Sequence, residues 1–87
     1  MLIRVTKAEF VEGSCGDCHA CPVALAIANT LKVASDNILV TPHTIQVLGV
    51  AYRVPVRVQR FIRRFDGGSD VKPFAFQLRR QEARRAA

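Results

Sequence analysis

The sequence predicts a small single α+β domain, with a mixed or antiparallel sheet of three to five strands and two helices packed on one face. Three observations lead to this fold class. The chain has 87 residues, 49% of them hydrophobic and 23% charged, which is a globular composition with room for one domain. Short β-branched runs are separated by two segments of helical character. No repeat or linker is visible, so we expect a domain over residues 1–78 and a basic tail over residues 79–87.

The N-terminal segment predicts a strand followed by a single helical turn. Residues 2–5 are mostly aliphatic, as expected for a short strand. Thr6 is followed three residues later by Glu9, which is the spacing of a capping box at a helix start. We therefore expect a helical turn over residues 6–12, ended by Gly13.

A second helix is expected over residues 22–32. Proline is well tolerated at the first helical position, so Pro22 marks the start and Cys21 lies near the N-cap. This helix is apolar nearly all the way round, which predicts burial on most sides, against a sheet or at an interface. A turn over residues 35–37 follows it.

The middle of the chain predicts a hairpin and a further strand. Residues 38–41 and 44–48 are β-branched runs on either side of Pro42. Gly49 suggests a bulge or a second turn before a strand over residues 50–54.

The last third predicts a helix and a final strand. The helix begins at Pro55 and ends at residues 66–68, which contain two glycines. Residues 74–78 alternate in polarity and predict a half-buried strand. The helix carries one apolar stripe at positions i, i+3, i+4 and i+7, formed by Val58, Phe61, Ile62 and Phe65.

Charge is divided unequally along the chain, whose formal net charge is +6. Residues 1–50 hold three basic and four acidic side chains, whereas residues 51–87 hold ten basic and three acidic ones. A concentrated positive field attracts polyanions and therefore indicates a class of partner, although it does not indicate a fold. A solubilising face with a basic tail is the competing interpretation.

Arginines form a row along the helix that begins at Pro55. Arg57, Arg60 and Arg64 recur at i, i+3 and i+7, a spacing at which like charges weaken a helix by roughly 0.2–0.5 kcal/mol per pair. Arginine favours planar, bidentate contact with phosphate or carboxylate. A solvated helix face in an arginine-biased gene would give the same residues in a scattered arrangement. The residues predicted to bind nucleic acid or an acidic protein surface are Arg53, Arg57, Arg60, Arg63, Arg64, Arg79 and Arg80.

Three cysteines lie within seven residues, and several chemistries fit them. A zinc site would use Cys15, Cys18 and Cys21 with His19 or His43, although a second distant pair of ligands is missing. Iron–sulfur ligation lacks a fourth cysteine. Residues 15–19 match the short haem-attachment pattern, which requires export. Dithiol redox chemistry at a helix N-terminus is a further option. The competing structural interpretation is a tight turn of reduced cysteines in which Cys21 caps the following helix.

Several classes of protein are excluded by what the sequence lacks. The longest apolar run, residues 23–28, is far shorter than the roughly 20 residues of a membrane span, and residues 1–4 do not resemble a signal peptide. We expect a cytoplasmic protein without a membrane partner. No phosphate-binding loop or serine nucleophile motif is present, so we expect no enzyme activity, and zinc is the one cofactor left open.

The chain resembles a family of short, functionally uncharacterised proteins of bacteriophage and bacterial genomes. The resemblance rests on CPVALA at residues 21–26, on residues 54–68 with their FDGG ending, and on VKPFAF at residues 71–76. It implies a compact phage-type accessory protein, acting in the host cytoplasm if phage-encoded, and it assigns no activity, cofactor or site. In the family pattern Cys21 and Pro22 are firmer than Cys15 or Cys18, which favours the capping role of Cys21.

The sequence thus predicts a small non-enzymatic binding protein that uses an arginine-rich helix face. One alternative is a zinc-binding or thiol-redox module built on the cysteine cluster. The other is a phage-encoded inhibitor or virion-associated protein that acts through the apolar helix and the surface around Phe74 and Phe76. An exposed apolar helix would also drive self-association, so a homo-oligomer is a further option.

Overall fold

Two antiparallel sheets and three α-helices make up the part of the chain that the computed structural model describes, residues 1–14, 16 and 19–80. The predicted α+β class is confirmed, and the strands divide between a two-stranded and a three-stranded sheet. The first sheet pairs β1 (Leu2–Val5) with β5 (Phe74–Gln77), and the second has the order β2 (Ile38–Val40), β3 (Thr44–Val47), β4 (Val50–Arg53). The helices are α1 (Lys7–Glu12), α2 (Pro22–Leu31) and α3 (Val56–Asp66), with a 3-10 turn η1 (Ser35–Asn37) before β2.

The start of α1 is fixed by a buried carboxylate. Glu9 Oε1 accepts hydrogen bonds from the Thr6 backbone N at 2.7 Å and from the Thr6 hydroxyl at 2.8 Å. The amide nitrogen of Asn29 in α2 lies 3.4 Å from the other carboxylate oxygen. A buried carboxylate is tolerated only when it is hydrogen-bonded in this way. The capping box expected from Thr6 and Glu9 is therefore present, and it also ties α1 to α2.

The beginning of α2 agrees with the expectation from Cys21 and Pro22. Cys21 is the N-cap, its Sγ accepts a hydrogen bond from the Ala24 backbone N at 3.4 Å, and Pro22 follows in the first turn. The helix ends at Leu31, and its C-cap residue Lys32 has a φ of 61°, in the left-handed region. Within the described residues, no helix combines the length and the apolar character that crossing a bilayer demands.

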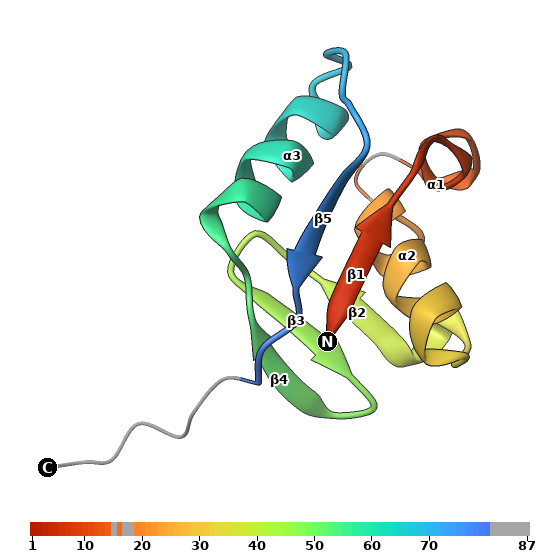
Figure 1. The fold of residues 1–87 in the computed structure, drawn as a ribbon, viewed down its shortest axis with the longest axis vertical. Coiled ribbons are helices and arrows are strands. Elements are labelled where there is room, and N and C mark those ends of the chain that lie inside the picture. Colours follow the sequence, from red (N-terminus) through yellow and green to blue (C-terminus); the bar gives the residue numbers. More distant parts are fainter. Residues whose placement is uncertain (15, 17–18, 81–87) are drawn as a thin grey trace, which may run out of the picture.

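The two sheets are joined through the segment that follows β5. The Arg53 backbone N donates to the Arg79 carbonyl at 3.0 Å, and Tyr52 forms an antiparallel bridge with Arg80. The strands therefore follow one another in space as β1, β5, β4, β3 and β2. Helix α2 packs against both β1 and β2, the two ends of this path. In Figure 1, α2 lies to the right of the β1–β5 pair and α3 to its left.

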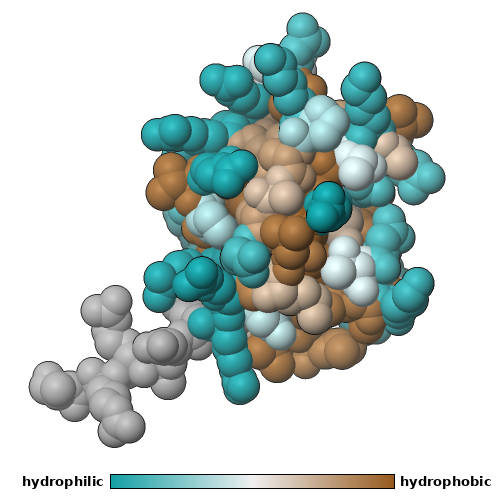
Figure 2. All heavy atoms as spheres, in the orientation of Figure 1, coloured by the Kyte–Doolittle hydropathy of each residue, from teal (hydrophilic) through white to brown (hydrophobic). Residues whose placement is uncertain are grey.

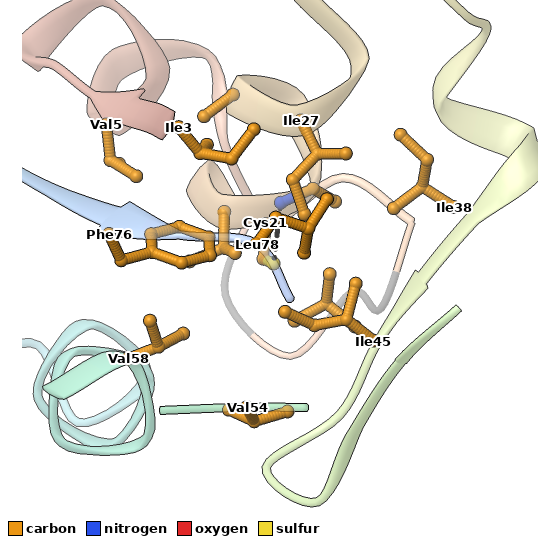
Figure 3. Close-up of a cluster of buried hydrophobic side chains, with 14 of the residues drawn as sticks. Ile3, Val5, Cys21, Ile27, Ile38, Ile45, Val54, Val58, Phe76 and Leu78 are labelled. Carbon is orange, nitrogen blue, oxygen red and sulfur yellow. Dashed lines mark hydrogen bonds between the residues drawn. The ribbon is translucent and has the colours of Figure 1, made fainter. Parts of the chain in front are cut away.

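The core lies between the two sheets and the helices. Figure 3 shows side chains from both sheets, α2 and α3 pointing toward one another, with Cys21 and Leu78 between them. In the first sheet, Ile3 lies opposite Phe76 and both face this core. The alternation of buried and exposed residues along β1 and β3 is the pattern expected of strands with one face on a core.

The turn between β3 and β4 holds a leucine in an unfavourable conformation. Val47 pairs with Val50, and the two residues between them, Leu48 and Gly49, have φ values of 51° and 82°. Positive φ at both positions defines the type I′ hairpin turn, which favours Asn-Gly. Leu48 is also 62% exposed, so its side chain gains little from packing.

We therefore expect Leu48→Asn to stabilise the fold by about 1 kcal/mol, because asparagine tolerates the left-handed region that leucine avoids. The measurement is thermal unfolding, with an expected rise in Tm of about 5 °C. Leu48→Ala is the matched control, since it removes the exposed side chain but keeps the unfavourable φ. An equal gain from both substitutions would show that exposure, and not backbone conformation, is the cause.

Candidate functional site: a basic groove beside α3

Helix α3 has one buried face and one arginine face, as its periodicity predicts. Val58, Phe61 and Ile62 are buried, whereas Arg57, Arg60, Arg63 and Arg64 are exposed. Phe61 follows Arg60 directly and stands four residues after Arg57, so it lies at the border between the two faces. The arginine row therefore runs beside the apolar stripe instead of being separated from it.

A groove of about 420 Å³ lies along this border. One wall is α3, and the other is the segment that leads into β5. The chain reverses at Gly67 and Gly68, where Gly67 N donates to the Arg63 carbonyl and Gly68 has a φ of 77°, so the segment returns beside the helix. The groove is lined by Arg57, Arg60, Phe61, Arg64, Asp70, Val71, Lys72, Pro73 and Phe74.

Aromatic rings lie beneath the groove. The Phe61 and Phe74 ring centroids are 4.8 Å apart with an interplanar angle of 44°. Phe10 lies 5.5 Å and Phe65 6.0 Å from Phe61, and Phe76 lies 6.0 Å from Phe74. All five phenylalanines of the chain thus belong to one connected cluster. Each ring therefore packs against at least one other ring, in geometries that are favourable for aromatic pairs.

Charge in the groove is strongly unbalanced. Among the described residues that line it, four are cationic and one, Asp70, is acidic. The acid of α3 itself, Asp66, accepts a hydrogen bond from the Gly16 backbone N at 3.1 Å and does not line the groove. Charges beside an apolar floor are less screened than charges in open water. The groove is therefore suited to an anion that also presents apolar surface.

The seven arginines predicted to bind a partner fall into separate groups. Arg57, Arg60 and Arg64 line the groove together, as the helical spacing predicts. A second group lies where β4 leads into α3, because Arg53 is hydrogen-bonded through its backbone to Arg79, which precedes Arg80. The remaining arginine of α3, at position 63, is exposed and does not line the groove.

Sequence reasoning did not find the second wall of the groove. Lys72 adds a cation to the lining, and Phe74 contributes a ring that the sequence assigned to a half-buried strand and to an alternative protein-contact surface, not to the arginine site. The available signal was the tight turn at Gly67 and Gly68, since a strand that follows a helix so closely must run back along it. A prediction of contact across that turn would have placed Lys72 beside α3.

The cysteine cluster is described only in part, because Cys15 and Cys18 lie outside the described residues. Cys21 is buried at the N-cap of α2. His19 is exposed, and its Nδ1 lies 2.7 Å from the Ile38 carbonyl oxygen, to which it donates. Over the ranges 1–14, 16 and 19–80, no three His, Cys, Asp or Glu side chains form a group that could hold a metal ion. The zinc and redox hypotheses for this cluster stay predictions.

A second hollow of about 500 Å³ lies beside η1 and the β3–β4 turn. Its described lining includes His19 and Asp36 and contains no arginine or lysine. His43, the other histidine considered as a zinc ligand, is exposed in the β2–β3 turn, where its backbone N donates to the Thr41 hydroxyl. The basic groove is thus the better candidate for an anionic partner.

Comparisons of the chain with protein-family models, with curated proteins and with solved structures give no match. Its function is therefore inferred from the groove, its charges and its aromatic floor.

Proposed function

We propose that this protein is a non-enzymatic nucleic-acid-binding protein, and that the arginine face of α3 holds the phosphate backbone. The observation that carries the proposal is the gathering of Arg57, Arg60 and Arg64 with Lys72 around one groove that holds a single carboxylate among its described residues. Phosphate contacts from arginine and lysine supply most of the affinity in non-specific nucleic-acid binding.

The spacing of the arginines supports a partner with regularly repeated charges. At about 1.5 Å per residue, Arg57 and Arg64 are separated by about 10 Å along the helix axis. Successive phosphates of a stacked strand advance by about 3.4 Å each, so the row covers about three of them. The second arginine group, beside the start of α3, would lengthen the contact.

The chemistry of the lining side chains also supports a binding role rather than catalysis. Its described ionisable side chains are arginines, one lysine and Asp70. Guanidinium groups hold an anion firmly but do not accept protons near neutral pH. A base paired with a nucleophile, which covalent or acid–base catalysis requires, does not occur among these lining residues. The phage-type accessory role, the cytoplasmic location and the homo-oligomer remain predictions.

The test is the salt dependence of binding to a fluorescein-labelled single-stranded oligonucleotide, followed by anisotropy. With about four phosphates neutralised at about 0.7 each, log Kd should change with log salt with a slope of about 3. Affinity should therefore fall about 50-fold between about 50 and about 200 mM salt. Absence of binding at the lower salt concentration would refute the proposal. Tight binding of oligoglutamate in its place would assign the groove to an acidic protein segment.

A further inference from the structure

We infer that the groove takes a single strand of nucleic acid rather than a duplex, with the phosphates on the arginine wall and a base against Phe74. This inference rests on the proposed function and names its substrate class. It depends on three features of the site: its concave shape, the cations on both walls and the ring in the floor. A strand with unpaired bases can enter the hollow, contact the cations through its phosphates and stack a base on the ring.

The shape of the site argues against a duplex. A helix that reads double-stranded DNA projects from the protein so that it can enter a major groove about 12 Å wide. In α3, the arginines at positions 57, 60 and 64 instead line a hollow shared with residues 70–74. The volume of about 420 Å³ lies in the range of small-ligand sites, roughly 300–1,000 Å³, which suits a flat ring and its phosphate.

The ring of Phe74 is placed to stack on a base. Phe74 is only half-buried, whereas Phe61 behind it is 7% exposed. Val5 lies opposite Phe74 in the β1–β5 pair, and the Phe61 and Phe76 rings flank it, so its orientation is fixed before a ligand arrives. Aromatic stacking contributes about 1–3 kcal/mol per base in proteins that bind single strands.

The two walls give a strand a definite orientation. Arginines occupy the α3 wall, and Lys72 with Pro73 occupies the other, so a phosphate backbone along α3 turns its bases toward the apolar floor. Figure 2 shows hydrophilic side chains over α3 beside a surface over β5 and β1 on which apolar residues lie among a few hydrophilic ones. Because every base has an apolar face, we expect weak sequence preference.

The experiment compares an oligothymidylate of about 12 nucleotides with a duplex of the same length, at one salt concentration, by anisotropy. We expect the single strand to bind about tenfold more tightly. Phe74→Leu keeps an apolar side chain but removes the ring, and it should weaken single-strand binding about tenfold while leaving duplex binding unchanged. Phe74→Tyr should restore the affinity. Phe10→Leu is the matched control, because Phe10 belongs to the same aromatic cluster but packs against Phe61 and does not line the groove.

The outcomes separate the two proposals. Equal or tighter binding of the duplex, or full single-strand affinity in Phe74→Leu, would overturn the single-strand inference and leave the nucleic-acid proposal standing. Failure of both probes to bind the unmodified protein would overturn both. Circular dichroism of each variant at the assay temperature confirms that loss of binding is not loss of fold.

Discussion

Replacing Arg57, Arg60 and Arg64 together by glutamine is expected to weaken oligothymidylate binding about 100-fold at low salt. These three exposed residues line one wall of the groove, and each charge-assisted contact with a phosphate is worth about 1 kcal/mol. About 3 kcal/mol corresponds to about two decades in Kd. The salt slope should fall from about 3 to about 1, because Lys72 is the one cation that remains among the described residues of the groove lining. Glutamine keeps the side-chain length and a good helix propensity, so α3 should remain folded.

The matched control removes the same number of charges elsewhere. Arg4, Lys7 and Lys32 are exposed, lie outside α3 and do not line the groove, so the triple glutamine variant at these positions has the same net charge as the groove variant. We expect it to retain affinity within about threefold, since distant exposed charges are largely screened at physiological salt. Equal losses in the two variants would show that binding follows net charge and not the groove.

Ile27→Ala is expected to destabilise the protein by about 3 kcal/mol and to lower Tm by about 15 °C. Ile27 is 0% exposed in α2, the helix that packs against both β1 and β2. Figure 3 shows its side chain among those of both sheets, so truncation leaves a cavity where the sheets meet. Chemical and thermal unfolding followed by circular dichroism measure the loss.

Leu25→Ala is the matched control for this prediction. Leu25 lies in the same helix but is only partly buried. Its truncation therefore removes less buried apolar surface and leaves a smaller cavity. We expect a loss of about 1 kcal/mol. A loss from Ile27→Ala no greater than that from Leu25→Ala would contradict the placement of α2 between the two sheets.

The elements themselves could be predicted because each has a local signal. Thr6 with Glu9, Cys21 with Pro22, and the glycines after α3 mark helix ends through backbone geometry and capping, which act over a few residues. The arginine row followed from the 3.6-residue period of α3. Interactions of this kind join residues that are close in the sequence. The structure has the helix ends and the exposed arginine row at the expected residues.

The second wall of the groove and the division into two sheets are set by contacts between distant segments. Nothing near Arg53 in the sequence indicates that its backbone bonds to Arg79, and nothing near Lys72 indicates that it lines the same groove as Arg60. Such pairings depend on how the core is filled and on which strand edges remain free. The periodicity that places Phe74 and Phe76 in a strand does not show which ring reaches a groove.

The most direct test of the groove is the set of backbone amide resonances that shift when oligothymidylate is added to the ¹⁵N-labelled protein. The largest shifts should fall on residues 57–64 of α3 and on residues 70–74, with smaller shifts near Arg53 and Arg79. Shifts concentrated around His19 and Asp36, or spread evenly over the molecule, would contradict the assignment of the basic groove as the binding site.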